Sequence, residues 1–180
     1  MDFFIEEAVV KKNKTFDEIV YYFSWLVIAL CALFAVMQLS SLTLAIASGE
    51  WPLTLILTLV SAGVAAGVYF YHDQLRMEYE YTFTNGSLDF ARVLNNKRRK
   101  SLGSLNVRTV EAFGPVSGQA FKRYSSMQGI RIDRWFLNRE ANLHFFYFQK
   151  EGSKRLIVLE PSDELVEMIR HYLPHGVYQE

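Results

Sequence analysis

The sequence predicts a membrane α-hairpin of two transmembrane helices joined to an α+β cytoplasmic domain, an antiparallel β barrel or sandwich capped by a C-terminal helix. Three observations predict this fold class. Residues 19–49 and 51–72 contain no Lys, Arg, Asp or Glu. Short segments with alternating apolar and polar side chains begin near Met77, and an amphipathic segment precedes Pro174. We expect three parts: an N-terminal segment (1–18), a transmembrane hairpin (19–72) and a cytoplasmic domain (77–180).

The composition of the 180 residues excludes several classes of protein. A chain that is 51% hydrophobic is not disordered, and a single cysteine excludes a disulfide framework and a Cys-only zinc site. The 19 basic and 19 acidic residues cancel, but unevenly. Residues 96–155 hold 13 basic and four acidic residues, a net charge of +9, whereas residues 156–180 hold one and five, a net charge of −4. The neutral total conceals a basic sheet and an acidic C-terminal helix.

The two uncharged stretches predict helices at about residues 23–46 and 52–72, because about 20 apolar helical residues cross a bilayer core roughly 30 Å thick. Residues 15–18 (Thr-Phe-Asp-Glu) fit a capping box before the first helix. Gly49 can adopt the left-handed conformation that ends it, and Pro52 suits the first turn of the second helix. The short connection predicts an antiparallel hairpin.

The flanking charges predict the orientation of this hairpin. Lys11, Lys12 and Lys14 precede the first helix, Arg76 follows the second, and the connecting loop has neither Lys nor Arg. The positive-inside rule then places both termini in the cytoplasm of a two-span plasma-membrane protein.

Gly63 and Gly67 form a G-x-x-x-G pattern in the second helix. Small residues at this spacing let another helix approach closely, as in helix dimers. Packing against the alanines of the first helix is the preferred alternative, because that helix is already a neighbour. The N-terminal segment also has two interpretations, a short helix on the inner leaflet or a segment packed on the cytoplasmic domain.

The cytoplasmic domain begins with a strand in which Tyr79, Tyr81 and Phe83 alternate with polar residues. Asn85-Gly86 predicts a hairpin to a second strand from Leu88. Further strands are expected at 105–113 and 130–135, a short helix or turn at 117–127, and a last hairpin of residues 143–148 and 156–159.

The C-terminal helix is predicted from its cap and its apolar stripe. Ser162 is the expected N-cap, followed by Asp163 and Glu164 in the first turn, where the helix dipole favours negative charge. The apolar residues that follow fall on one helical face; they are Leu165, Val166, Ile169, Tyr172 and Leu173.

The hairpin, the strands and the C-terminal helix opening Glu-Pro-Ser-Asp-Glu-Leu (160–165) resemble bacterial membrane proteins with pleckstrin-homology-like (PH-like) domains. More closely, residues 2–4 (Asp-Phe-Phe), Lys11-Lys12 and the 79–83 strand look like an uncharacterised family of small two-span proteins of Gram-positive bacteria. The resemblance implies six to seven strands, of which six are placed above. Members of the wider fold bind phosphoinositides, peptides or proteins, so the fold does not fix the ligand.

No pattern typical of an enzyme is present. Phosphate-binding glycine loops and nucleophile elbows are absent, and the four histidines lack metal-site spacing, so we expect no catalytic residue, no metal ligand and no cofactor. Lys97, Arg98, Arg99 and Lys100 instead form a basic cluster on an expected loop between two strands. The cluster suits anionic lipid headgroups or an acidic protein partner, and a merely solvated loop is the alternative. Nucleic acid is not expected, because aromatic strand motifs of RNA-binding domains are missing.

The sequence therefore predicts a non-catalytic, membrane-anchored module whose cytoplasmic domain binds anionic lipid headgroups or a protein partner through Lys97–Lys100. The alternative is an accessory subunit of a larger integral membrane complex, or a homodimer, assembled through the hairpin at Gly63 and Gly67.

Overall fold

A computed structural model describes residues 3–179 of the chain, so Asp2 of the N-terminal pattern and Glu180 of the acidic end lie outside the described residues. The chain forms two compact units. The strand-rich unit contains residues 3–12, 78–93 and 97–179, and the helical unit contains residues 13–77 and 94–96. The strand-rich unit is therefore discontinuous in sequence, with the helices inserted after its first strand.

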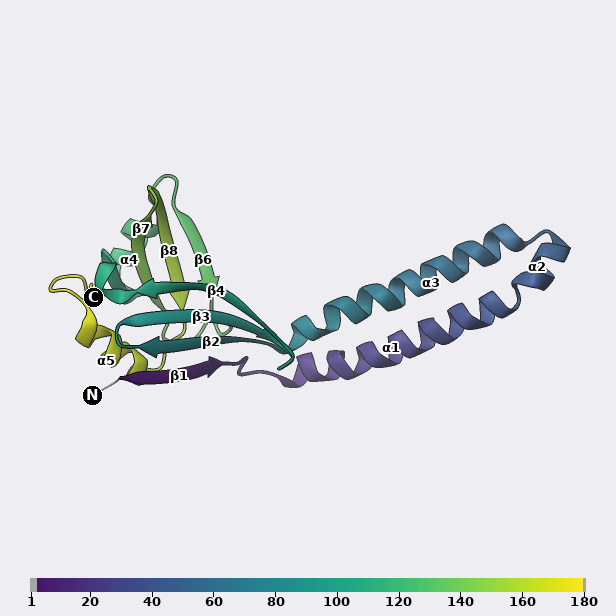
Figure 1. Ribbon diagram of the computed structural model, residues 1–180, viewed down its shortest axis with the longest axis horizontal. Coiled ribbons are helices and arrows are strands. Elements are labelled where there is room, and N and C mark those ends of the chain that lie inside the picture. The colour runs from purple at the N-terminus through teal and green to yellow at the C-terminus, as the bar shows by residue number, and fades with distance from the viewer. Residues whose placement is uncertain (1–2, 180) are drawn as a thin grey trace. The chain divides into compact units, whose positions relative to one another are not determined.

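The helical unit is an antiparallel hairpin of apolar helices (Figure 1). It contains α1 (Thr15–Ser40), α2 (Leu42–Ser48), α3 (Trp51–Tyr71) and the 3₁₀ helix η1 (His72–Arg76). Two helical stretches, Thr15–Ser40 and Trp51–Arg76, are long and apolar enough to cross a membrane. Only 17% and 6% of their most apolar windows are buried, which distinguishes them from the core helices of a soluble domain.

The ends of these helices differ partly from the expectation. Gly49 has φ 82° and ends α2, and Pro52 lies in the first turn of α3, as predicted. The predicted capping box is wrong, because α1 begins at Thr15 itself and no side chain caps it. The first helix also starts before the expected residue 23 and is interrupted at Ser41, where α1 gives way to α2.

The first sheet has the order β1-β2-β3-β4 and consists of β1 (Phe4–Val9), β2 (Met77–Thr84), β3 (Ser87–Leu94) and β4 (Arg98–Asn106). β1 pairs antiparallel with β2, from Phe4 opposite Thr84 to Val9 opposite Tyr79. The N-terminal segment is thus a strand of the domain and not a short helix. Asn85 (φ 50°) and Gly86 (φ 95°) form the predicted turn between β2 and β3.

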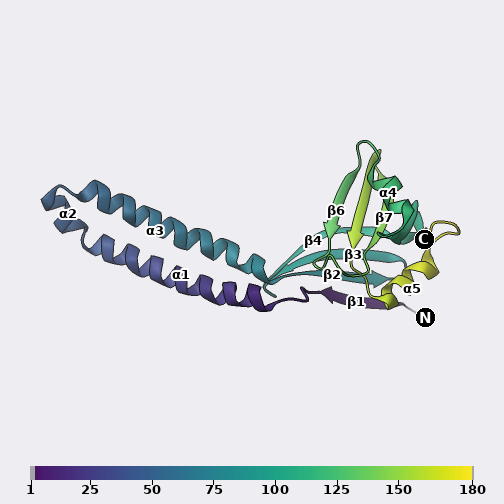
Figure 2. The ribbon, with the colours of Figure 1, turned by 180° about the vertical axis from the view of Figure 1, so that it is seen from behind.

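The second sheet has the order β5-β7-β8-β6 and consists of β5 (Ala112–Pro115), β6 (Arg131–Trp135), β7 (His144–Lys150) and β8 (Ser153–Leu159). Figure 2 shows β6 and β7 of this sheet from behind. β7 and β8 form the predicted hairpin, but β6 pairs parallel with β8. The expectation of a wholly antiparallel domain is therefore wrong. So is the single strand at 105–113, because β4 ends at Asn106 and the short 3₁₀ helix η2 (Val107–Thr109) separates it from β5.

Two helices complete the strand-rich unit. α4 (Gln119–Ser125) occupies the stretch for which the sequence predicts a short helix or a turn. α5 (Asp163–Tyr172) is the predicted C-terminal helix, and the Ser162 side chain accepts a hydrogen bond from Leu165 N at 3.1 Å, as expected of the cap. The predicted apolar stripe is buried at Leu165, Val166 and Ile169.

Large apolar side chains from both sheets and from α5 form the core, including Phe83, Phe90, Phe145 and Leu165. The sheets are also joined by a hydrogen bond, since the Tyr81 hydroxyl donates to the Trp135 carbonyl oxygen of β6. Among residues 3–179 there are eight strands in two sheets rather than six to seven. Closure of these sheets into a barrel stays a prediction.

Candidate functional site

The predicted basic cluster lies where β4 begins. Lys97 ends the turn after β3, whereas Arg98, Arg99 and Lys100 are the first residues of β4, so three of the four residues are on a strand and not on a loop. All four side chains are exposed. Because neighbouring residues of a strand point to opposite faces, the four positive charges do not form one continuous group.

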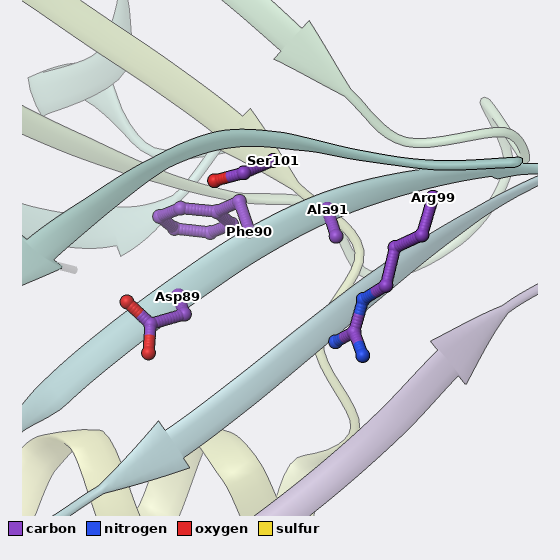
Figure 3. A pocket seen from close by; sticks show the side chains of 5 residues that line it. All are labelled: Asp89, Phe90, Ala91, Arg99 and Ser101. Atoms are coloured by element: carbon purple, nitrogen blue, oxygen red, sulfur yellow. The ribbon is translucent and has the colours of Figure 1, made fainter.

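Arg99 is held by carboxylates of the neighbouring strands. Its Nε lies 2.8 Å from Glu80 Oε2 on β2, and its Nη2 lies 3.9 Å from Glu6 Oε1 on β1. Arg99 and Asp89 both line a shallow hollow of about 350 Å³, and Figure 3 shows the side chains around it. Ala91 of β3 also lines this hollow, and a small side chain there leaves room for the arginine to reach across the sheet. Arg99 therefore forms its ion pairs with other strands of the same sheet.

The other three residues of the cluster are the available cations. Lys97, Arg98 and Lys100 have no ion-pair partner within the described part of the chain. We call these three residues the exposed cations. Their charges are free to interact with an external anion, whereas the charge of Arg99 is largely compensated.

Residues 94–96, which precede the exposed cations, belong to the helical unit. The backbone N–H of Asn95 donates to the Arg76 carbonyl oxygen at 2.7 Å. Its side-chain amide donates to Asp73 Oδ1 at 2.7 Å and to the Tyr21 hydroxyl at 3.1 Å. Asn95 and Asn96 both have positive φ, which asparagine tolerates better than most residues. Residues 94–96 are thus bonded within the helical unit, and Lys97 follows them in the sequence.

Aromatic side chains surround this end of the hairpin. His72, only 4% exposed, packs against the rings of Tyr21, Trp25 and Tyr69 at centroid distances of 5.1–5.6 Å. The Arg76 guanidinium lies 3.9 Å from the centroid of the Tyr21 ring. Sequence reasoning singled out neither the contacts of His72 with these rings nor the hydrogen bonds of Asn95.

Gly63 and Gly67 lie on α3 with open surroundings. A Cβ built on either residue would meet no heavy atom within 4 Å. The close packing against the first helix that the sequence favoured is therefore not seen at these Cβ positions, and Gly63 is exposed whereas Gly67 is half-buried.

The next question is whether the other titratable residues form a metal site or an acid–base site. Residues 3–179 contain no cluster of three or more His, Cys, Asp or Glu side chains that could hold a metal ion. His144 is buried, its ring stacks on Phe113 at 5.4 Å, and its Nδ1 lies 3.2 Å from the Asn142 carbonyl oxygen. Burial lowers the pKa of His144, so the imidazole is a neutral packing group near pH 7.

Comparison with known proteins identifies a family. A family model described as "Bacterial PH-like domain (DUF6106)" matches residues 1–179. No curated protein and no solved structure matches the chain. The match begins at the first residue, in keeping with the finding that β1 and the strands after the hairpin form one sheet.

Proposed function

Because the chain belongs to the bacterial PH-like domain family DUF6106, we propose that it is a non-catalytic module, anchored in the plasma membrane by its hairpin, whose domain binds anionic headgroups of the inner leaflet through the exposed cations. The carrying observation is that Lys97, Arg98 and Lys100 have no ion pair within residues 3–179 and follow Asn95, which is hydrogen-bonded to Asp73 and Arg76 at the end of the hairpin. PH-like domains are in general binding modules and not catalysts.

The pairing of β1 with β2 supports a hairpin that enters and leaves the membrane on the same side. Val9 lies opposite Tyr79, so the strands before α1 and after η1 are neighbours in one sheet. Two spans satisfy this constraint, whereas one or three would separate the strands by a bilayer. Lys12, Lys14 and Arg76 flank the helices, and the positive-inside rule makes that side the cytoplasm.

Chain connectivity supports contact of the exposed cations with the same leaflet. Asn95 is bonded to Asp73 and Arg76 beside the end of α3, and Lys97 is only two residues further along the chain. Each basic residue close to an anionic leaflet contributes about 1 kcal/mol, so three contribute up to about 3 kcal/mol. For a domain that the hairpin already tethers, this energy orients the domain and does not recruit it.

The test uses the whole chain in lipid nanodiscs, because a fragment starting at residue 77 would lack β1. A fluorophore at Ser101→Cys, in a Cys31→Ser background, reports quenching by nitroxide-labelled headgroups. We expect quenching to be severalfold stronger with phosphatidylglycerol than with phosphatidylcholine alone, and to decline with added salt.

Matched triple variants decide whether the exposed cations are responsible. Lys97→Ala with Arg98→Ala and Lys100→Ala should abolish the response to anionic lipid. The control removes three exposed cations elsewhere, Lys122, Arg139 and Lys150, and should leave the response intact. Equal quenching on neutral and anionic nanodiscs, or equal losses in both triples, would refute lipid binding by this cluster.

A second candidate function is an accessory subunit or homodimer assembled through the hairpin. It is favoured by the open strip at Gly63 and Gly67, where no heavy atom of the hairpin lies within 4 Å of a Cβ position. Gly63→Leu with Gly67→Leu should release a stoichiometric integral partner, or a second copy, in a mild-detergent pull-down. Ala62→Leu with Ala66→Leu is the control at exposed positions of the same spacing, turned by one residue, or about 100°, around the helix. Retention of the partner by the glycine variant would exclude this interface.

A further inference from the structure

The last described residues of the chain lie along the outer edge of the second sheet. β5 is the end strand of that sheet and pairs on one side with β7. On its other side, Phe113 N donates to the Val177 carbonyl oxygen at 3.0 Å, and Gln179 N donates to the Phe113 carbonyl oxygen at 2.8 Å. Phe113 and Tyr178 form a parallel bridge. Residues 177–179, which we call the tail, thus extend the sheet by one short parallel strand.

The β5 edge is shaped for close approach of a second backbone. A Cβ at Gly114 would overlap the Gln179 carbonyl oxygen, so only glycine lets the tail lie there. The φ of Gly114 is not in the left-handed region, and conformational freedom is therefore not why glycine is needed. Glycine is needed at position 114 only because the backbone of residue 179 lies so close to it.

Side chains add specificity to these backbone contacts. The Arg170 guanidinium of α5 lies 4.3 Å from the centroid of the Tyr178 ring, and the Phe113 ring lies 6.0 Å from it. Arg123 of α4 donates to Gln179 Oε1 at 3.3 Å. These contacts hold an aromatic side chain that is followed by a hydrogen-bond acceptor.

The tail is held weakly for a strand. Its two backbone hydrogen bonds to β5 contribute about 1 kcal/mol each, and Tyr178 remains partly exposed. A segment bound this way opens far more readily than the core strands do.

We propose that the β5 edge is a peptide-binding site that the tail occupies intramolecularly, and that an extended segment of a partner protein with an aromatic residue replaces the tail by strand addition. The seated tail specifies this ligand: parallel to β5, free of steric demand at Gly114, with its aromatic ring against Arg170. This site goes beyond the proposed lipid contact, because it lies on a different sheet and takes a different class of ligand.

The experiment measures binding of a labelled peptide, Pro-His-Gly-Val-Tyr-Gln-Glu, to the protein in nanodiscs by fluorescence anisotropy. A chain that ends at Gly176 should bind the peptide at least tenfold more tightly than the intact chain, because the tail competes at a high effective concentration. A peptide with alanine in place of tyrosine should lose most of this affinity. In the shortened chain, Gly114→Val should abolish binding, and Arg170→Ala should weaken it severalfold. Arg131→Ala, at an exposed position of β6 on the opposite edge of the sheet, should not change it.

A second variant covers the case in which the shortened chain does not fold. Tyr178→Ala in the full chain keeps the tail backbone but weakens its docking, and should likewise increase peptide affinity. Circular dichroism checks the fold of every variant. Peptide binding that is equal in the intact and shortened chains, or absent from both Tyr178→Ala and a folded shortened chain, would overturn the proposal. Neither outcome bears on the lipid response at β4.

Discussion

Arg99 of β4 and Glu80 of β2 are joined across the middle strand β3 by an ion pair of 2.8 Å between Nε and Oε2. The pair divides four consecutive basic residues into two kinds. Arg99 forms an ion pair within the sheet, whereas Lys97, Arg98 and Lys100 face solvent without an ion-pair partner within residues 3–179. An electrostatic response to the membrane should therefore depend on position within the cluster and not only on its total charge.

Single substitutions test this division. Arg98→Ala should lower the response to anionic nanodiscs by about a third, since it removes one of three available charges, whereas Arg99→Ala should leave it nearly unchanged. Glu80→Ala should increase the response, because it releases Arg99 from its stronger carboxylate partner. The measurement is headgroup quenching at low salt. Equal losses for Arg98→Ala and Arg99→Ala would show that the ion pair does not withhold the Arg99 charge.

Glu7 predicts a dependence of stability on pH. Its carboxylate accepts the Ser162 backbone N–H at 3.2 Å, and burial raises the pKa of Glu7 above 4.5 despite that hydrogen bond. The folded state then binds a proton that the unfolded state has lost, so the free energy of unfolding should fall as pH rises from about 4.5 through the raised pKa. Glu7→Gln should remove this fall, measured by chemical denaturation between about pH 4.5 and 7.5.

Glu6→Gln is the matched control for this prediction, because Glu6 is the exposed neighbour on the opposite face of β1. It should keep the pH dependence of the wild-type chain. An unchanged slope in Glu7→Gln would assign the dependence to another group.

Hairpin turns and the helix cap were predicted correctly, because each depends on a few consecutive residues. Asn85-Gly86 and Glu151-Gly152 adopt the positive φ angles of hairpin turns, and Ser162 caps α5. The N-terminal strand was not predicted, because its partner β2 is about 70 residues away and its Glu6-Glu7 pair interrupts a simple alternation. The parallel pairing of β6 with β8 is likewise a tertiary feature that no local pattern encodes.

For the basic cluster, the sequence likewise predicted the residues but not their contacts. A run of four basic residues is visible in the sequence, but the pairing of Arg99 requires β1, β2 and β4 to lie in one sheet. The bonds from Asn95 to Asp73 and Tyr21 join residues that are 22 and 74 positions apart. Such contacts follow from the fold and not from residue spacing.

Asn138 should stabilise the attachment of the N-terminal strand. Its side chain donates to the Val10 carbonyl oxygen at 2.9 Å and to Glu160 Oε1 at 2.8 Å, and it accepts from Lys12 N at 2.8 Å. Asn138→Ala should lower the free energy of unfolding by about 1–3 kcal/mol and accelerate hydrogen exchange in residues 4–9. Asn142→Ala, at an exposed position of the same loop, should do neither. Unchanged exchange in β1 after Asn138→Ala would mean that pairing with β2 alone holds the strand.

Tyr81 offers the sharpest test of how the two sheets are joined. Its buried hydroxyl donates to the Trp135 carbonyl oxygen and accepts from Glu160 N at 3.3 Å, and burial raises its pKa, which keeps the phenol protonated as a donor. Tyr81→Phe leaves both backbone groups without this partner and should cost about 1–3 kcal/mol of unfolding free energy, measured by chemical denaturation. Tyr79→Phe is the control in the same strand. The Tyr79 hydroxyl lies 3.5 Å from the Arg134 carbonyl oxygen, at the limit of a hydrogen bond, and its removal should cost less. Equal costs for the two substitutions would show that packing of the rings, and not the hydroxyl of Tyr81, holds the sheets together.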